Sequence, residues 1–232
     1  QEQNVPVVQL TVRSDVQELL KQQLGAEKGS IVVMEAKTGA IVGMYSNPSF
    51  DPNPLTTHDQ YQAQTSFTQL NNDPLKPSLS RAFGERYAPG STFKIVTASA
   101  ALETGKADDD FDFGALFFYD LPDSDKNLRN YGGGACGGTL QHAFQQSCNV
   151  VFASLGNDMG NDFTTQMEKF GVGGTFKDGQ NIGPIPKLDI PGAVGASGTI
   201  EGGYSTNKPS FANAGIGQGV IALSPLSVAL MT

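Results

Sequence analysis

The sequence predicts an α/β (α+β) fold, in which a β-hairpin near the beginning of the chain is followed by a series of helices. Two apolar runs, at residues 31–36 and 40–45, flank a turn that carries Gly39, as expected of a hairpin with glycine at the left-handed position. Apolar residues at helical spacing, between capping residues and glycines, indicate the helices. The 232 residues are enough to bury a full core, and one domain is the default expectation for this length.

A strand and a helix are predicted before the hairpin. Residues 7–13, Val-Val-Gln-Leu-Thr-Val-Arg, predict a short strand. Ser14 is predicted to cap the helix that follows, with Gln17 three residues later as its partner in a capping box. Gly25 is predicted to end this helix, because glycine tolerates the left-handed conformation just past a helix end.

The middle of the chain combines loops with one strongly apolar helix. Three prolines in residues 47–54 predict an extended loop, and the polar residues 55–80 carry no clear pattern. Residues 91–105 predict a helix that is apolar nearly all round, which is typical of a buried helix. The aromatic run at 111–119 predicts a strand or a buried anchor. The glycines and prolines of residues 172–210 predict a long loop of the kind that lines a site.

Further helices are predicted in the second half of the chain. They are expected at residues 139–146, 150–155 and 162–170, and from Ser224 onward. Thr139 is a good N-cap for the first of them, and Gly156 is expected to end the second. Ser224 followed by proline is typical of a helix start.

The composition excludes several classes of function. A formal net charge of −8 makes a nucleic-acid partner unfavourable on electrostatic grounds. The sequence has no stretch of 18 apolar residues, so this segment is not expected to span a membrane, and the residues from Gln1 onward do not resemble a signal peptide. Its two cysteines, Cys136 and Cys148, show no metal-ligand spacing, and spacing alone leaves both a single bridge and two free thiols open.

The predicted helix at 91–105 contains one residue that does not suit a buried helix. Lys94 lies among apolar residues, and burying an unpaired ammonium costs several kcal/mol, so its amine is expected to be paired or partly neutral. Ser91 lies three residues earlier, on the same helical face. A serine beside a buried lysine predicts an activated nucleophile. The alternative interpretation is a capping serine and a lysine that extends to the surface.

A second polar group interrupts the predicted apolar helices. Ser147-Cys148-Asn149 lies between the helices at 139–146 and 150–155 and places a hydroxyl and an amide at their junction. The alternative interpretation is a simple helix break with an N-cap. Together with Ser91 and Lys94, however, this triplet forms the SxxK and SxN pair of motifs that resembles penicillin-binding proteins and serine β-lactamases.

The resemblance extends along nearly the whole chain, from about Val5 to Thr232, and identifies the class B penicillin-binding proteins. It includes the segments at 47–53, 81–82 and 87–94, the SxN triplet, and the Gly217-Gln218-Gly219 turn before Ser224. The segment at 130–133 and the cysteine-bearing loop after it are similar to the actinobacterial A-type branch. The resemblance implies a β-lactamase/transpeptidase-like fold, with an antiparallel sheet flanked by helices. It also favours a bridge between Cys136 and Cys148.

The resemblance further implies a peptidoglycan D,D-transpeptidase that cross-links stem peptides through a serine acyl-enzyme and is inhibited by β-lactam antibiotics. No metal or organic cofactor is expected. The family is anchored in the cell membrane with its catalytic domain outside the cytoplasm, and cell-wall synthesis or division proteins are expected as partners.

Roles are carried over to four residues. Ser91 is expected to attack the D-Ala-D-Ala carbonyl, and Lys94 to accept the serine proton. Ser147 is expected to relay a proton to the leaving amine, and Asn149 to bind the substrate amide and hold Lys94. The Ser91 backbone N–H is expected to be one oxyanion donor, at the beginning of its helix.

One part of the family pattern is expected outside this sequence. The third motif, a KTG on a strand, should follow the Gly217-Gln218-Gly219 turn, and Thr232 comes first. Lys37-Thr38-Gly39 is rejected as a substitute, because it lies in the turn of the predicted hairpin. Residues 1–232 are therefore expected to be an incomplete transpeptidase domain, without the membrane anchor, the KTG segment and the C-terminal strands, and to be inactive alone.

Other functions are weighed against this one. A class A β-lactamase needs a glutamate after SxN to activate the water that hydrolyses the acyl-enzyme. No glutamate lies between Glu168 and Glu201, so fast β-lactam hydrolysis is disfavoured. A D,D-carboxypeptidase uses the same motifs with water as acceptor, and a β-lactam sensor domain acylates without turnover, so both remain alternatives. A cysteine hydrolase built on Cys148 and His142 is disfavoured, because no orienting Asn or Asp is evident.

Overall fold

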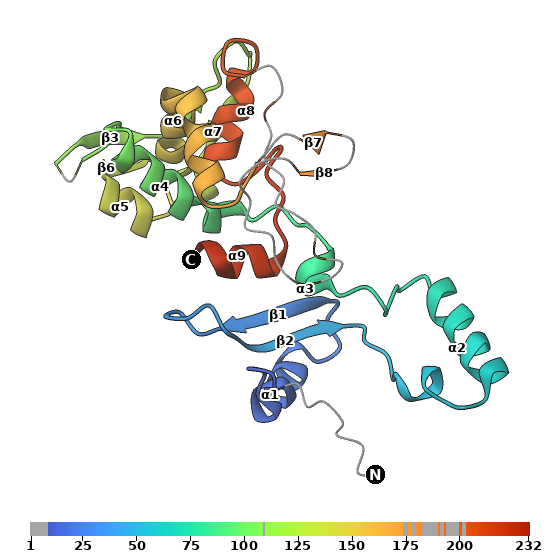
Figure 1. Ribbon diagram of the computed structural model, residues 1–232. Coiled ribbons are helices and arrows are strands. Elements are labelled where there is room, and N and C mark those ends of the chain that lie inside the picture. The colour runs from blue at the N-terminus through green and yellow to red at the C-terminus, as the bar shows by residue number, and fades with distance from the viewer. Residues whose placement is uncertain are drawn as a thin grey trace. The chain divides into compact units, whose positions relative to one another are not determined.

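The computed structural model describes residues 9–232, apart from 109, 174–175, 178–179, 182–189, 191–192, 194–199 and 201–202. The chain divides into two compact units, the first up to Glu85 and the second from Arg86 onward. Each unit is described by itself below. In both, the described strands are antiparallel and helices pack beside them, as the resemblance implies (Figure 1).

The first unit is built on the predicted hairpin. Strands β1 (Gly29–Met34) and β2 (Ile41–Asn47) pair antiparallel, and Gly39 has a φ of 72° in the turn between them. Helix α1 (Ser14–Leu24) packs on this ribbon at β2. The packing is close because β2 carries Gly43, where a Cβ would collide with side chains of α1.

Two expectations for the beginning of the chain are wrong. The described residues of the predicted strand at 7–13 form no strand, and only the Arg13 amide and the Thr11 hydroxyl reach β2. The capping box is also absent, because the Gln17 side chain bonds instead to the backbone N–H and C=O of Met44 on β2. The Gln17 side chain therefore bonds to a residue that is distant in the sequence, and not to the N-terminus of its own helix as the local pattern predicted.

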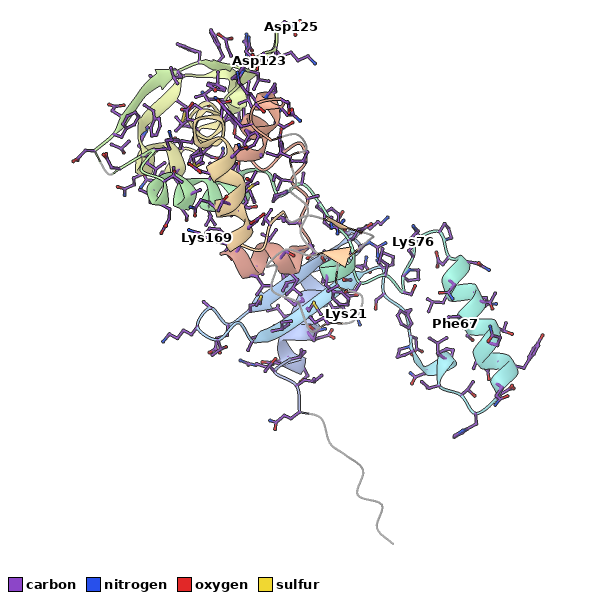
Figure 2. The ribbon with its side chains drawn as sticks, turned by 45° about the horizontal axis from the view of Figure 1, so that its top comes forward. Lys21, Phe67, Lys76, Asp123, Asp125 and Lys169 are labelled. Carbon is purple, nitrogen blue, oxygen red and sulfur yellow. A yellow bond between two sulfur atoms is a disulfide. The ribbon has the colours of Figure 1, made fainter. Side chains whose placement is uncertain are left out.

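Two further helices lie in and directly after the segment without a clear pattern. The helix within residues 55–80 is α2 (Gln60–Asn72), which follows the short 3₁₀ helix η1 (Asn53–Leu55), and the second, α3 (Arg81–Gly84), comes directly after this segment. Helix α2 has no buried residue, and its Phe67 is half exposed and visible on its surface (Figure 2). Because α2 has no apolar face, periodicity could not predict it. Its start is nevertheless marked by Asp59, whose side chain accepts from two backbone N–H groups.

The second unit is mainly helical, with short antiparallel ribbons (Figure 1). Its helices are η2 (Gly90–Phe93), α4 (Lys94–Glu103), η3 (Tyr131–Gly133), α5 (Leu140–Gln145), α6 (Asn149–Met159), α7 (Asn161–Lys169), α8 (Lys208–Gly215) and α9 (Pro225–Met231). Its strands are β3 (Asp112–Leu116), β4 (Phe118–Asp120), β5 (Asn127–Arg129), β6 (Cys136–Thr139), β7 (Phe176–Lys177) and β8 (Gln180–Asn181). They pair as β3 with β6, β4 with β5, and β7 with β8.

Helix α6 lies at the centre of the core of this unit. Most of its residues are buried, and it packs against α4, α7 and α8 (Figure 1). The predicted end of this helix at Gly156 is wrong. Gly156 lies inside α6, where a Cβ would meet the Phe211 carbonyl and Gly215 of α8. Its missing side chain therefore allows two helices to approach closely, and Gly160 follows the helix end instead.

The other capping predictions for this unit are confirmed. The Thr139 hydroxyl accepts a hydrogen bond from the His142 backbone N–H at the start of α5. Ser224 accepts from the Ser227 backbone N–H at the start of α9. The aromatic run at 111–119 forms β3 and the beginning of β4. Most of the glycine- and proline-rich segment at 172–210 lies outside the described residues.

The described helices also bear on membrane insertion. Within the part of the chain that the structure describes, no helix has the length and apolar character needed to cross a bilayer.

Candidate active site

The Lys94 amine is the centre of a polar network inside the second unit. Lys94 begins α4 and is only 1% exposed. Its Nζ lies 3.2 Å from Ser91 Oγ, 2.9 Å from Ser147 Oγ and 2.8 Å from Asn149 Oδ1. It also lies 2.7 Å from the Ser147 carbonyl oxygen. The structure therefore brings together all four residues singled out from the sequence.

The number of partners indicates which form of the amine suits the site. An ammonium has three protons to donate and no lone pair, whereas Nζ has four oxygen neighbours, of which two are hydroxyls that can themselves donate. A neutral amine can donate to the Ser147 carbonyl and to Asn149 Oδ1, while its lone pair accepts a proton from one of the hydroxyls. The network is thus suited to an amine that takes a proton from serine.

Burial acts in the same direction on the protonation of Lys94. Removal from water lowers the pKa of Lys94 from 10.5 to about 8, because the charged form loses its hydration. Within the described residues no carboxylate forms an ion pair with this lysine. The ring of Phe152 lies 5.5 Å from Nζ and closes the apolar side of the site.

Ser91 is held in the short 3₁₀ helix η2, directly before α4. The Gly90 N–H donates to the Gly217 carbonyl at 3.0 Å, which ties this turn to the segment after α8. Gly217 has a φ of 69°, and a Cβ there would meet the Gly90 carbonyl and the Phe93 Cβ. The predicted glycine turn therefore serves as the close backbone support of the serine. Ser91 itself remains exposed.

Asn149 begins α6, and its amide is oriented from both ends. Its Oδ1 faces Lys94, while its Nδ2 donates to the Arg129 carbonyl at 3.2 Å. The adjacent Asn130 is buried, and its Oδ1 accepts from the Val150 N–H at 3.1 Å. Its Nδ2 donates to the carbonyls of Leu116 and Gly134, both at 2.9 Å. Asn130 thus ties the loop after β5 to the beginning of α6.

A cavity of about 550 Å³ opens over these groups. Its lining consists of Ser91, Asn130, Tyr131, Gly134, Ala135, Cys136, Gln146, Ser147, Cys148, Asn149, Ile216 and Gln218. The exposed Ser91 hydroxyl and the half-buried Ser147 hydroxyl and Asn149 amide are therefore all accessible from one hollow. A reacting group in this cavity could contact the Ser91 and Ser147 hydroxyls at the same time.

The two cysteines form a disulfide between β6 and the SxN triplet. The spacing of the cysteines left a single bridge and two free thiols open, and the structure shows the bridge, as the resemblance favoured. It also removes the cysteine-hydrolase alternative, because Cys148 has no free thiol. The His142 Nδ1 lies 2.8 Å from the Gly137 carbonyl. In the part of the chain that the structure describes, no cluster of His, Cys, Asp or Glu could hold a metal ion.

Sequence reasoning did not single out Asn130, Tyr131 or Gln218 as functional. Asn130 and Tyr131 belong to the segment that carries the resemblance to the A-type branch, and Gln218 lies between the two glycines of the turn. The weak signal for Asn130 is its place beside a glycine-rich turn. Its hydrogen bonds to two separate segments and to α6 are visible only in three dimensions.

Comparison with known proteins gives one family. The model of the penicillin-binding protein transpeptidase domain matches residues 29–232. The chain is 37% identical over 207 residues to the peptidoglycan D,D-transpeptidase PbpA of Mycolicibacterium smegmatis, covering 87% of this chain and 39% of that protein. It is 35% identical to PbpA of Mycobacterium tuberculosis, covering 88% of this chain and 39% of that protein. The chain thus spans about two fifths of the length of these curated relatives.

Solved structures agree with the sequence comparison. The penicillin G acyl-enzyme complex of penicillin-binding protein A from M. tuberculosis matches with a TM-score of 0.79 at 29% identity, covering 94% of this chain and 49% of that one. A ceftriaxone acyl-enzyme complex of the same protein matches with a TM-score of 0.77 at 29% identity, covering 94% of this chain and 48% of that one.

Proposed function

Because the chain belongs to the penicillin-binding protein transpeptidase family, as a class B member of the PbpA type, we propose that it carries the nucleophile and general base of a peptidoglycan D,D-transpeptidase. The single observation that supports this best is the contact of the buried Lys94 amine with Ser91, Ser147 and Asn149 beside one cavity. This arrangement joins a nucleophile, a base and a proton relay.

Acylation begins with the Ser91 hydroxyl. Its proton moves to the neutral Lys94 Nζ while Oγ bonds to the carbonyl carbon of the penultimate D-Ala of a stem peptide. The carbonyl oxygen becomes an oxyanion, which accepts a hydrogen bond from the Ser91 N–H at the beginning of the helix. The C–N bond then breaks, and the proton passes from Lys94 through the Ser147 hydroxyl to the leaving nitrogen of the terminal D-Ala.

Transfer reverses these steps with a new acceptor. The amine of a second stem peptide attacks the acyl carbon, gives up a proton to Lys94 through Ser147, and forms the cross-linking amide. The Ser91 Oγ leaves and regains a proton from Lys94. Asn149 holds the substrate amide and limits the rotation of the lysine. A β-lactam enters by the same attack, which opens its ring and leaves the acyl group on Ser91.

Other parts of the proposal rest on the family alone. Peptidoglycan stem peptides are the substrates, β-lactams are the inhibitors, and no metal or organic cofactor takes part. The second oxyanion donor is expected from a KTG strand outside this sequence, and a membrane anchor is expected to hold the domain outside the cytoplasm. Contacts with cell-wall synthesis or division proteins are part of the same proposal.

The proposal is tested with the full-length protein, a pentapeptide donor ending in D-Ala-D-Ala and an amine acceptor. Release of D-Ala and formation of the cross-linked product are measured by mass spectrometry. Both are expected for the wild type and lost in Ser91→Ala. The matched control Ser205→Ala, which removes an exposed serine of the same unit, should behave as the wild type.

The same assay separates the two enzymatic alternatives. A transpeptidase gives mainly the cross-linked peptide when the acceptor is present, whereas a D,D-carboxypeptidase gives mainly the shortened tetrapeptide. Acylation by penicillin without D-Ala release from the donor would favour a sensor. D-Ala release that survives in Ser91→Ala would contradict the assignment of the nucleophile.

A further inference from the structure

Two glutamine side chains in the candidate active site have no assigned task. Gln146 and Gln218 both line the cavity over Ser91, and both are exposed. Within the part of the chain that the structure describes, neither side-chain amide has a hydrogen-bond partner. Apart from the exposed Tyr131, the other polar side chains of the lining belong to the mechanism, to the disulfide or, at Asn130, to hydrogen bonds with the backbone. The two glutamines are therefore available to a ligand that enters the cavity.

Gln146 lies beside the residue that relays the proton. It follows the last residue of α5 and directly precedes Ser147, so their Cα atoms are about 3.8 Å apart. The Ser147 hydroxyl lies 2.9 Å from the Lys94 amine, and Gln146 and Ser147 line the same cavity. Gln218 lies instead on the turn after α8, which accepts a hydrogen bond from Gly90 beside the nucleophile. Of the two amides, Gln146 is therefore the one next to the proton relay.

The transfer step brings its amine to this side of the cavity. The acceptor nitrogen bonds to the acyl carbon, the bond from that carbon to Ser91 Oγ breaks, and the proton of the amine passes through Ser147 to Lys94 and on to the serine. An attacking amine must lie about 3–3.5 Å from the acyl carbon and within hydrogen-bonding reach of Ser147 Oγ. The acceptor atoms next to this nitrogen consequently lie beside Gln146.

The chemistry of a glutamine side chain suits such an acceptor. Among the described residues that line the cavity, none has a charged side chain. A carboxylate at this place would pair with the acceptor and favour its ammonium form, which has no lone pair for the attack. The neutral amide of Gln146 can instead donate to a carbonyl and accept from an N–H, which are the two groups of a peptide bond. It can thus bind the acceptor without suppressing its reactivity.

We propose that Gln146 binds the acceptor of the transfer step, through hydrogen bonds between its side-chain amide and the amide group that neighbours the attacking amine. This inference rests on the proposed function and names the chemistry of its second substrate, an amine flanked by a peptide or carboxamide group. It also gives the acyl-enzyme a basis for reacting with an amine rather than with water, because Gln146 holds only the amine.

The size of the expected effect follows from the number of hydrogen bonds. Loss of one hydrogen bond between neutral groups weakens binding about 2- to 10-fold, and a side-chain amide can make two with a peptide group. Gln146→Met keeps a side chain of similar length and removes the amide donor and acceptor. The ratio of transfer product to hydrolysis product is therefore expected to fall at least about fivefold in this variant.

The experiment measures how the acyl-enzyme of the full-length protein divides between an amine and water. A pentapeptide donor ending in D-Ala-D-Ala is supplied with glycinamide, or with ethylamine, which has a methyl group in place of the carboxamide. The two acceptors are compared at equal concentrations of neutral amine, and the amide and tetrapeptide products are quantified by mass spectrometry. The product ratio does not depend on how fast Ser91 is acylated, so a change in it reports the transfer step.

The wild type should react more with glycinamide than with ethylamine. Gln146→Met should lower the product ratio at least about fivefold with glycinamide and less than about twofold with ethylamine. The matched control is Gln145→Met, because Gln145 is an exposed glutamine directly beside Gln146 that is not among the residues lining the cavity. It should keep both wild-type ratios. Acylation by a fluorescent penicillin and thermal unfolding are recorded for each protein.

Three results would overturn the proposal. The first is a wild type that reacts equally with the two amines, which needs no variant. The second is a Gln146→Met protein that is acylated by penicillin and keeps the wild-type ratio with glycinamide. The third is an equal fall with both amines, which would assign Gln146 to the shape of the relay rather than to the acceptor.

Failure of the proposed function gives a different result. A wild type that releases no D-Ala from the donor, or that forms no amide product with either amine, would contradict the transpeptidase assignment, and the inference about Gln146 would fall with it. D-Ala release and an amide product with both amines, but without the preference for glycinamide, would contradict only the inference.

Discussion

The protonation of Lys94 should control how fast Ser91 reacts, and pH is the direct way to change it. Burial lowers the pKa of this lysine from 10.5 to about 8, which corresponds to about 3 kcal/mol in favour of the neutral amine. The neutral form is the proton acceptor, so acylation should rise as the pH rises toward 8 and should be lost as the pH falls below it.

The magnitude follows from the fraction of neutral amine. With a pKa of about 8, this fraction is about 1% at pH 6, about 9% at pH 7 and about 50% at pH 8. The second-order rate constant for acylation should therefore increase about 50-fold from pH 6 to pH 8 and then level off. A lysine with the ordinary pKa of 10.5 would instead give a rise of about tenfold per pH unit beyond pH 9.

The assay is the acylation of the full-length protein by a fluorescent penicillin at constant ionic strength between pH 6 and pH 9.5. Lys94→Arg is the matched variant, because arginine keeps the positive charge and cannot be deprotonated. The acylation rate constant of this variant should be lower by about 10²–10⁴-fold and should not rise with pH. A flat wild-type profile, or one that still rises tenfold per unit at pH 9.5, would refute this reasoning.

Further predictions concern the residues that support the lysine and the serine. Asn149→Asp places a carboxylate beside the ammonium, so it should raise the pKa of Lys94 and move the midpoint of the acylation profile above pH 8, as the same pH series would show. Gly217→Ala inserts a Cβ against the Gly90 carbonyl and should lower the acylation rate about 10-fold or more. The control Gly219→Ala has the same φ but more room, so it should lower only the free energy of unfolding, by about 1–2 kcal/mol. Asn130→Ala should lower the midpoint of thermal unfolding, because it removes the hydrogen-bond partner of three backbone groups. Each such group costs about 1–3 kcal/mol when it is buried without a partner. An unchanged midpoint would contradict this role of Asn130.

The parts of the fold that could be predicted are those whose cause is local. Thr139 and Ser224 mark helix starts because each hydroxyl caps a backbone N–H three residues later. Gly39 marks the hairpin turn because the chain needs a positive φ there. Gly156 misled the prediction because its cause is tertiary, the close approach of α8. Helix α2 gave no periodic signal because it buries no residue, and only the capping Asp59 marks its start.

The contacts in the candidate site could likewise be predicted only where they are local in the sequence. Ser91 and Lys94 are separated by one helical turn, so their contact could be predicted from spacing. Ser147 and Asn149 are more than 50 residues from Lys94, and only the resemblance placed them beside it. Nothing local indicates that Asn130 joins two segments to α6.

The pairing of the two cysteines could not be predicted from their local sequence either. Their spacing of 12 residues permits a bridge without requiring one, and the packing of β6 beside the triplet decides it.

The most direct test of the central claim is the intact mass of the full-length protein after incubation with benzylpenicillin, followed by peptide mapping of the adduct. The mass should increase by one penicilloyl group in the wild type, with the group located on Ser91. The Ser91→Ala variant, with its unfolding transition preserved, should show no increase. An adduct that forms equally in Ser91→Ala, or that maps to another residue in the wild type, would contradict the assignment of Ser91 as the nucleophile.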